Sequence, residues 1–298
     1  MPAPALAAAP APAPATAPPA PPASPLADAY ARLTAVYDGL HVVERAAHEP
    51  APRGAGWVGA DELAAGGPAL DAFLAWDRAQ VLQDYGREAR PDVVATFGLH
   101  RYTWRACLLT TVPWFLDRRV PRLAPADVAV HRPRGRISVR AESFACLPDD
   151  PAAALPGARV VPDAAALRDE VRAAVAHHLE PVLDGFGPRT RRRHRALWGL
   201  ATDSLVAGLW YAAKLLDEEQ RAIAELQALL PGATAPYTGG AGFRTLTGPG
   251  GMPLATRDRV SCCLFYTIRP EETCVTCPRT CDADRVTRLT ARAAATTG

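Results

Sequence analysis

The placement of the cysteines constrains this 298-residue chain more than any other feature. Five of its seven cysteines lie in one short stretch near the C-terminus, whereas Cys107 and Cys146 stand alone. A disulfide-stapled domain spreads its cysteines over the whole chain, and nothing in this sequence indicates export. A disulfide framework is therefore the weaker interpretation. The clustering predicts a local metal or cluster site on a chain that folds around an ordinary hydrophobic core.

Composition narrows the class of protein. With 49% hydrophobic and 21% charged residues, the chain has the composition of a soluble globular protein. Its 33 basic and 31 acidic residues leave a net charge of +2, which argues against a dedicated nucleic-acid binder. Lys214 is the single lysine. Because arginine replaces lysine throughout and not in one patch, a coding bias explains the excess better than a set of anion-binding forks.

The start of the chain differs from the rest. Residues 1–25 contain ten prolines and no charged side chain. Such a tract cannot bury enough apolar surface to fold, and proline interrupts every stretch that a signal peptide would need. We therefore expect a disordered leader over residues 1–25, a helical body over residues 26–257 and a cluster-binding segment over residues 258–298.

Apolar residues recur at helical spacing through most of the body. Asp163 stands where it can cap a helix, and Gly86 stands where it can end one. Pro113 and Pro121 bracket a separate short apolar piece, so the preceding helix is expected to stop at residue 110. The expected helices cover residues 33–40, 70–85, 92–110, 163–184, 189–216 and 217–230.

One stretch follows a different period. Apolar and polar residues alternate over residues 135–142, which predicts a strand, and Val128 and Val130 can supply its partner. Residues 231–258 are rich in Gly, Pro and Thr and are expected to form a long loop. The expected fold class is α+β: predominantly α-helical, with a small antiparallel β element and a cysteine-rich C-terminal segment that binds a cluster.

Residues 196–216 are apolar enough to need a test as a membrane span. Asp203 and Lys214 lie inside this stretch and would be costly in hydrocarbon, so a buried core helix is the better interpretation. A basic run over residues 189–195 precedes it. This run is either a solvated helix start or a surface for anionic lipid or an acidic protein. Basic charge opposes the dipole at a helix start, which mildly favours a functional use.

The chemistry of the chain lies in the spacing of four cysteines. Cys262 and Cys263 are adjacent, ten residues separate them from Cys274, and Cys277 completes a Cys-x-x-Cys turn. Such a turn aims two thiolates at one metal, and four thiolates suit zinc or an iron–sulfur cluster. Zinc sites usually use two separated Cys-x-x-Cys turns, whereas a two-iron cluster offers two metal centres to adjacent thiolates. The spacing favours iron–sulfur and leaves zinc open.

This segment resembles the FhuF-type ferric-siderophore reductases. The resemblance rests on the Cys-Cys-x10-Cys-x2-Cys pattern, followed by Pro278 and preceded by a basic residue, on Tyr266, and more weakly on residues 197–199. It implies a [2Fe-2S] cluster and a helical body similar to the C-terminal domain of siderophore synthetases that need no peptide template. The cluster ligands that it implies are Cys262, Cys263, Cys274 and Cys277.

The same resemblance implies a reaction. The chain is expected to be a ferric-siderophore reductase, which passes one electron to the bound iron and releases Fe(II) for use in the cytoplasm. Hard oxygen donors hold Fe(II) less firmly than Fe(III), so reduction frees the metal without destroying the chelator. The implied partners are a ferric siderophore and an electron donor, either a protein or a soluble reductant, and no nucleic acid. The expected location is cytoplasmic, with peripheral contact to the inner membrane or a siderophore importer.

Two other functions fit the cysteine pattern. An iron–sulfur protein can act as a redox or iron sensor that controls a partner without reductase turnover. A helical binding domain can also carry a structural zinc tail. Neither alternative needs a substrate, and the sequence itself assigns no substrate-binding residue and no catalytic residue beyond the cluster.

Several residues have both a structural and a functional interpretation. Arg259, Arg269 and Arg279 surround the cysteines, where they either tune the site or are simply solvated. Cys281 falls outside the four-cysteine pattern and is expected to be a bystander thiol. Core packing is the default for the aromatic residues that could line a chelate, and for histidines without a second ligand nearby. These residues are Trp198, Trp210, Phe243, Tyr266, His100, His177 and His178.

Overall fold

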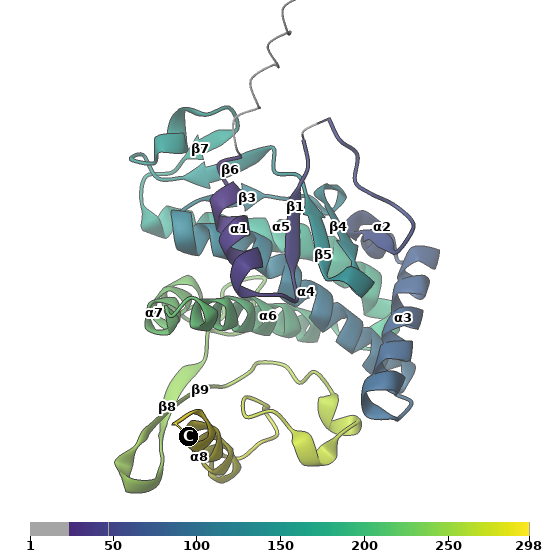
Figure 1. Cartoon of the computed structure of the whole chain (residues 1–298), viewed down its shortest axis with the longest axis vertical. Helices are drawn as coiled ribbons and strands as arrows, with labels where there is room; N and C mark the ends of the chain where they lie inside the picture. The colour runs from purple at the N-terminus through teal and green to yellow at the C-terminus, as the bar shows by residue number, and fades with distance from the viewer. Residues whose placement is uncertain (1–23, 47, 298) are drawn as a thin grey trace, which may run out of the picture.

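A computed structural model describes residues 24–46 and 48–297 of the chain. The expected leader over residues 1–25 lies almost wholly outside this part. In Figure 1, helices α4 and α6 cross the centre of the molecule, with small sheets on one side and the C-terminal segment on the other. The cysteine-rich segment is therefore carried directly on the helical layer.

Helices dominate the fold, as expected. Their packing buries leucines, valines and aromatic rings in one main core, to which α4, α5 and α6 all contribute. The expected α+β class with a small antiparallel element is confirmed. The helices are α1 (Ala27–Val36), α2 (Ala60–Ala65), α3 (Pro68–Tyr85), α4 (Pro91–Asp117), α5 (Ala164–Thr190), α6 (His194–Leu215), α7 (Glu219–Leu229) and α8 (Asp282–Thr297).

The central helix α4 is longer than its prolines predicted. It runs to Asp117 through Pro113, so the expected end at residue 110 was wrong. Proline lacks the N–H that would bond the carbonyl four residues earlier. The hydroxyl of Tyr30 donates to that carbonyl, of Leu109, at 2.9 Å. A tertiary contact from α1 thus satisfies the group that the proline leaves free.

Helix α5 also outruns its expected end. Asp163 caps it as predicted, but the helix continues to Thr190 and not only to residue 184. Gly185, just past the expected end, lies inside the helix and allows close packing, because a Cβ there would lie 2.4 Å from a carbonyl oxygen of α2. Helix α6 begins at His194, so residues 189–190 of the basic run end α5, residues 191–193 form the turn, and residues 194–195 begin α6.

Three small sheets flank the helices. The predicted strand over 135–142 forms as β5, antiparallel to β4 as expected, and β1 pairs with its other edge in parallel. The first helix ends at Val36 and not at residue 40, because Asp38 and Gly39 turn the chain into β1. The strands are β1 (His41–Glu44), β2 (Trp57–Gly59), β3 (Val120–Arg122), β4 (Val128–His131), β5 (Arg136–Val139), β6 (Ser143–Cys146), β7 (Ala158–Val160), β8 (Phe243–Thr247) and β9 (Pro253–Arg257).

The expected loop over residues 231–258 contains a hairpin. Strands β8 and β9 pair antiparallel, and the N–H of Gly248 donates to the carbonyl of Met252 across the turn. The glycines and prolines over residues 231–242 lie in irregular chain, as expected, whereas those over residues 248–251 mark a tight turn. The two strands lack the apolar alternation that would have revealed them. The hairpin lies beside α8 (Figure 1). The proposed division at residue 257 stays a prediction.

Helix α6 lies in the core, as its internal charges predicted. Leu197, Ala201 and Leu205 are buried on it together with Asp203, which is paired with arginine. Along the described chain, no helix is both long and apolar enough to span a membrane.

The cysteine loop, residues 258–281, follows the hairpin and runs along the helical layer. A small apolar cluster holds its middle: Ile268 is buried with Val81 of α3 and Phe97 of α4. The ring of Phe265 meets that of Tyr85 edge-on, with centroids 5.5 Å apart. Residues from α3 and α4 therefore support the loop between its two cysteine pairs.

Candidate metal centre

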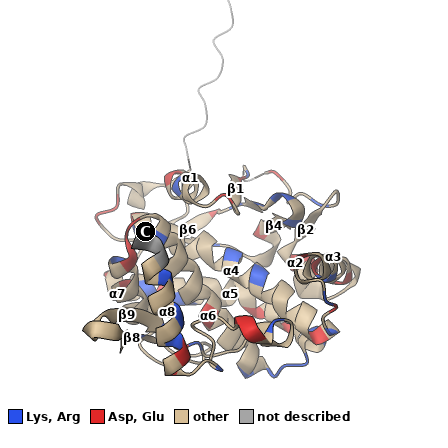
Figure 2. Cartoon of the chain, turned by 60° about the horizontal axis from the view of Figure 1, so that its bottom comes forward, with Lys and Arg blue, Asp and Glu red and all other residues tan. Residues whose placement is uncertain are grey.

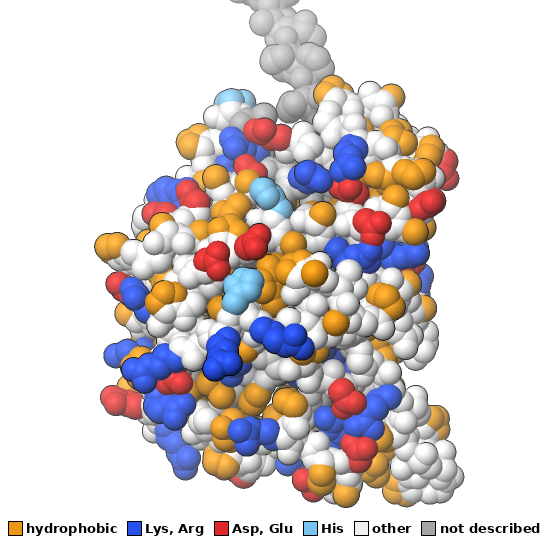
Figure 3. Space-filling model, turned by 180° about the vertical axis from the view of Figure 1, so that it is seen from behind, with side chains coloured by type: hydrophobic (Ala, Val, Ile, Leu, Met, Phe, Trp, Pro, Cys, Tyr) orange, Lys and Arg blue, Asp and Glu red, His pale blue; other side chains and the backbone are white. Residues whose placement is uncertain are grey.

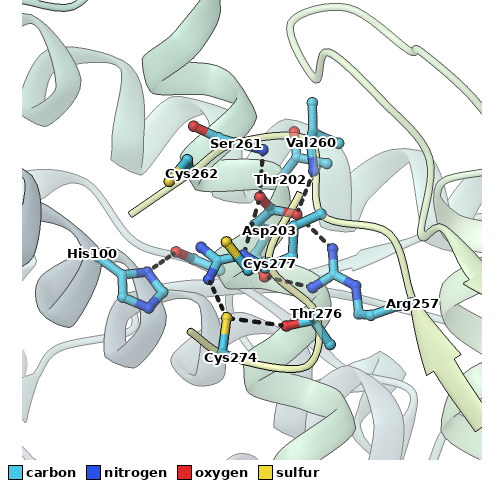
Figure 4. Close-up of polar contacts among 12 residues, drawn as sticks. His100, Thr202, Asp203, Arg257, Val260, Ser261, Cys262, Cys274, Thr276 and Cys277 are labelled. Atoms are coloured by element: carbon cyan, nitrogen blue, oxygen red, sulfur yellow. Dashed lines mark hydrogen bonds and ion pairs between the residues drawn. The ribbon is translucent and has the colours of Figure 1, made fainter. Parts of the chain in front are cut away.

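Asp203 fixes the chain just before the adjacent cysteines. Its carboxylate, on α6, is 0% exposed and accepts hydrogen bonds from the N–H groups of Val260 and Ser261 at 3.0 and 2.8 Å. Arg257 of β9 donates to the same carboxylate at 2.6 Å. A buried carboxylate is stable only when such partners replace its lost water. These contacts, drawn in Figure 4, attach residues 257–261 to α6 and set where the cysteines begin.

Arg259 links this carboxylate to the cysteines. Its Nε lies 3.5 Å from the Asp203 carboxylate, and its Nη1 lies 4.0 Å from the sulfur of Cys274. Burial alone would lower the pKa of Arg259, but Asp203 and the thiolates of Cys263 and Cys274 outweigh burial and raise it. Its Nη2 is buried and has no hydrogen-bond partner among the described residues. A fixed positive charge with a spare donor therefore lies beside the sulfurs.

The adjacent cysteines are accommodated by a sharp turn. Leu264, directly after Cys263, takes the left-handed conformation with φ of +68°, which ordinary side chains rarely adopt. Its N–H donates to the sulfur of Cys262 at 3.4 Å. Arg192, from the α5–α6 turn, donates to the carbonyl oxygen of Cys262 at 2.6 Å and to the hydroxyl of Ser261 at 3.1 Å. The bend that neighbouring ligands require is thus present, and one arginine of the basic run holds it.

The Cys-x-x-Cys turn forms as its spacing predicts. The N–H of Cys277 donates to the carbonyl of Cys274 at 3.0 Å, and the hydroxyl of Thr276 donates to the Cys274 sulfur at 3.8 Å. Burial raises the pKa of the Cys277 thiol, and the charges of the other three cysteine thiolates raise it further. All four are free thiols. The two cysteine pairs therefore lie within electrostatic reach of each other.

Helix α8 ties down the far end of the loop. Arg285 is buried and donates to the carbonyl oxygens of Cys277 and Thr280 at 3.0 and 3.2 Å. It also donates to the carboxylate of Asp258 at 2.5 Å, and Arg244 of β8 pairs with that same carboxylate at 2.8 Å. The hairpin, the cysteine loop and α8 are therefore one hydrogen-bonded unit.

This donor set fits a two-iron cluster. Four free thiols lie with an arginine charge, a backbone N–H and a hydroxyl directed at sulfur, which are surroundings that stabilise cluster thiolates. Within residues 24–46 and 48–297, no three His, Cys, Asp or Glu side chains form a group that could hold one metal ion. A two-iron cluster takes two thiolates at each iron, which suits a site built from two pairs of cysteines.

Of the side chains of Arg259, Arg269 and Arg279, that of Arg259 donates to a sulfur. Arg269 pairs with Glu272 at 2.6 Å, and Arg279 stacks over the ring of Tyr266 at 4.0 Å from its centroid. Cys281 is exposed. These side chains lie at the surface of the cysteine loop and do not surround the thiols.

The remaining aromatic and histidine candidates mostly pack in the core, as expected. Trp198 meets the ring of Tyr237, and Trp210 meets that of Phe243, so no single wall forms with Tyr266. Of the two adjacent histidines, His177 is exposed, and His178 forms hydrogen bonds with the Tyr102 hydroxyl and the Leu123 carbonyl inside the body.

His100 is the one histidine beside the site. Its Nδ1 lies 3.2 Å from the hydroxyl of Ser204, which follows Asp203 on α6. Burial lowers the pKa of His100 to about 3, and the positive charges of Arg259 and Arg101 contribute to the shift. Its imidazole is therefore neutral at physiological pH. Figure 4 shows it close to the Cys274 side of the site.

Sequence reasoning missed the residues that shape the site. Asp203 was identified only as a charge that a membrane helix would not tolerate, and Arg192 only as part of a basic run. Arg257 and Arg285 gave no signal, since arginine is common throughout the chain. A lone aspartate in an apolar helix was the usable signal, because a buried carboxylate must find cationic or N–H partners elsewhere in the fold.

Comparison with known families agrees with this geometry. Residues 259–279 match the FhuF 2Fe-2S C-terminal domain, a range that includes Arg259 and both cysteine pairs. The match confirms the resemblance seen in the cysteine spacing, and with it a [2Fe-2S] cluster as the cofactor of this segment. No curated protein matches the chain. The family match covers most of the cysteine loop and leaves the helical body without an assignment.

Proposed function

Because residues 259–279 match an FhuF 2Fe-2S domain, we propose that the chain is a ferric-siderophore reductase. In this proposal one electron passes from the cluster to the ferric iron of a siderophore, and Fe(II) is released. The observation that carries the proposal is that four free thiols lie, as two pairs, on one loop that a buried aspartate attaches to a large helical body. That body supplies the surface on which a chelate can dock beside the loop.

The cluster ligands in this proposal are the four thiols of the motif, and Cys281 is not among them. Cys281 is exposed, and its carbonyl accepts the N–H of Arg285 at 3.0 Å, so it marks the start of α8. Its place in the chain is explained without a metal. The proposed ligands are Cys262, Cys263, Cys274 and Cys277.

When bound, the [2Fe-2S] cluster supplies one electron at a time. The chain holds the thiols in place through Asp203 and Arg192, and Arg259 offsets part of their negative charge. The N–H of Leu264 and the hydroxyl of Thr276 donate to sulfur, and such bonds favour the more electron-rich state. Reduction lowers the charge of the substrate iron, and hard oxygen donors then hold it less firmly.

The electron donor and the location belong to the same proposal. The sequence has no nucleotide-binding loop, so electrons come from a separate donor protein or a soluble reductant. Arg191 and Arg193 are exposed in the turn beside Arg192, and basic side chains gather along the lower left edge of Figure 3. Basic residues next to the cysteine loop suit an acidic donor protein, or an anionic membrane surface at the inner face of the plasma membrane.

Anaerobic mixing tests the reductase function. The holoprotein is reduced with dithionite, freed of excess reductant, and mixed with ferric hydroxamate, catecholate and carboxylate siderophores in the presence of an Fe(II) trap. The expected result is reoxidation of the cluster with matching formation of trapped Fe(II). The matched control is the Cys263→Ser variant, which should form no trapped Fe(II).

Two results would contradict the proposal. A reduced cluster that survives unchanged with every siderophore leaves a redox or iron sensor as the better function. Zinc without visible absorbance, in protein purified anaerobically, contradicts both cluster functions.

A further inference from the structure

A cavity of about 250 Å³ opens on the helical body beside α4. Three of the residues that line it are aromatic and two are arginines. We call it the α4 cavity. Its lining residues are Tyr37, His100, Arg101, Trp104, Arg105 and Tyr211. In Figure 2 basic residues of α4 lie in the middle of the view, between α8 and α3.

The α4 cavity carries positive charge that the protein does not neutralise. Among the described residues, no carboxylate pairs with Arg105, and its Nε is buried without a hydrogen-bond partner. Burial lowers the pKa of Arg105 accordingly. Arg101 pairs with Asp77 at 3.0 Å, a carboxylate that it shares with Arg132, and with Asp84 at 3.8 Å, so the charge that stays without a carboxylate is that of Arg105. A partly buried guanidinium without an anion is costly, and a bound anion would remove the cost.

Part of the cavity lining is aromatic. The ring of Tyr37 meets Trp104 and Tyr211 edge-on, with centroids 5.4 and 5.6 Å apart, and Trp104 lies 5.6 Å from Tyr211. Tyr211 is 43% exposed, so its ring is accessible to a ligand. Rings of this kind provide flat apolar contact to a ligand, while the arginines provide charge.

A short chain of contacts joins the cavity to the sulfurs. His100 lines the cavity and lies 3.2 Å from the Ser204 hydroxyl, and Ser204 follows Asp203 on α6. Asp203 lies 3.5 Å from Arg259, whose Nη1 is 4.0 Å from the Cys274 sulfur. A molecule in the cavity is therefore separated from the cysteine loop by very few side chains.

We infer that the α4 cavity is the docking site for ferric chelates of net negative charge, in preference to neutral ones. This inference rests on the proposed reductase function and names its substrate class and binding residues. The cavity is smaller than a whole siderophore, so it holds one iron-binding arm while the rest stays at the surface. The reaction balances as one electron from an external one-electron donor to the cluster and then to Fe(III), giving Fe(II), with no bond formed to the protein.

Redox-inert gallium complexes separate binding from reduction. The holoprotein is titrated with three Ga(III) complexes, using Trp fluorescence and calorimetry: the trianionic complex of a tris-catecholate, the anionic complex of a citrate-type carboxylate chelator and the neutral complex of a tris-hydroxamate. We expect both anionic complexes to bind at least tenfold more tightly than the neutral one. Comparison of the affinities of the catecholate and carboxylate complexes shows which class of anionic chelate binds more tightly beside the aromatic residues.

Substitutions in the α4 cavity test whether it is the binding site. Arg105→Gln should weaken binding of the anionic complexes about tenfold or more and leave the neutral complex nearly unchanged, because it removes one charge-assisted contact. Arg105→Lys should retain most of the charge effect. Tyr211→Ala, at an exposed ring, provides a second test if Arg105→Gln folds poorly. The matched control is Arg159→Gln, at an exposed arginine of β7 that pairs with Glu170.

The outcomes distinguish this inference from the reductase function. Equal affinity for neutral and anionic gallium complexes, or unchanged affinity in both Arg105→Gln and Tyr211→Ala, overturns the cavity assignment even where reduction of ferric siderophores is observed. Charge-selective gallium binding that is lost in Arg105→Gln supports the cavity even where no ferric complex is reduced, in which case the reductase function fails and the anion site remains.

Discussion

Two buried aspartates in this molecule have similar partners and different consequences. Asp77 on α3 and Asp203 on α6 are both 0% exposed, and each is paired with two arginines. Asp77 joins Arg101 of α4 to Arg132 in the turn between β4 and β5. Asp203 also accepts two backbone N–H groups from the chain that leads into the cysteines.

The difference lies in what each charge organises. Asp77 balances cations between elements that already share the main hydrophobic core. Asp203 shapes a loop whose own apolar contacts amount to a small cluster around Ile268. A short segment cannot fold by burial alone, so hydrogen bonds from a buried carboxylate on the body replace the missing core. The comparison teaches that the same ion-pair chemistry stabilises the body in one place and the cofactor site in the other.

The largest expected effect is loss of the cluster when one of its proposed ligands is replaced. Serine at any one of the four proposed ligand positions should abolish the [2Fe-2S] spectrum, because serine replaces a thiolate ligand of iron. Iron and sulfide content and the visible and EPR spectra provide the measurement. The ligand substitutions are Cys262→Ser, Cys263→Ser, Cys274→Ser and Cys277→Ser.

Two cysteines serve as controls for this series. Cys281→Ser, at the exposed start of α8, and Cys107→Ser, in the core of the body, should both keep the cluster. Loss of the cluster in Cys281→Ser together with its retention in Cys262→Ser would overturn the ligand assignment.

The second prediction separates the two aspartates directly. Asp203→Asn and Asp77→Asn should each lower the free energy of unfolding by about 3–5 kcal/mol, because each leaves buried arginines without their anion. Only Asp203→Asn should also lower the iron bound per folded chain, by several-fold. Urea unfolding followed by circular dichroism measures the first quantity, and iron analysis of folded protein measures the second. Equal loss of iron in both variants would remove the distinction between the regions.

The third prediction concerns the helical body and the dependence of its folding stability on pH. Burial lowers the pKa of His178 to about 4, below the usual value near 6.5. Between these values the unfolded chain binds a proton that the folded chain does not, so stability falls as pH drops from about 6.5 to 4. The shift corresponds to about 3 kcal/mol. His178→Gln should flatten this part of the stability curve, measured by urea unfolding at several pH values. An unchanged slope in the variant would show that the acid sensitivity arises elsewhere.

The smallest expected effect is on the midpoint potential of the cluster, through a hydrogen bond to a cysteine sulfur. Thr276→Val removes the hydroxyl that donates to Cys274 at 3.8 Å. Since such a bond favours the reduced cluster, its loss should lower the midpoint potential by on the order of tens of millivolts. Potentiometric titration followed by EPR gives the value. Thr287→Val, on the exposed side of α8, is the matched control and should leave the potential unchanged.

The sequence predicted the parts of the fold that follow from local patterns. Asp163 was predicted as a helix cap and does cap α5. The alternation of apolar and polar residues correctly predicted β5 and its partner β4. The errors came where tertiary contacts override local signals. Pro113 lies inside α4 because Tyr30 satisfies the freed carbonyl, and Gly185 allows α2 to approach α5 closely. No local pattern contains that information.

In the site, too, local patterns were predictable and tertiary contacts were not. Spacing alone located the four thiols, since ligand spacing is a property of one short segment. The residues that shape the loop come from several other elements and lie far from it in the chain: Arg192 is 70 positions from Cys262, and Arg87 is 181 positions from Ile268. A single sequence does not show which arginine of a basic run reaches the loop. The fold was needed to separate Arg192 and Arg259 from their solvated neighbours.

The most direct test of the whole account is the stoichiometry of a single turnover. Reduced protein with a known number of EPR-active clusters is mixed anaerobically with excess ferric siderophore, and trapped Fe(II) is counted against the lost EPR signal. The account predicts one Fe(II) for each cluster oxidised, with no reaction in the Cys263→Ser variant. Fe(II) that forms equally in that variant, or an EPR signal that persists, would contradict it.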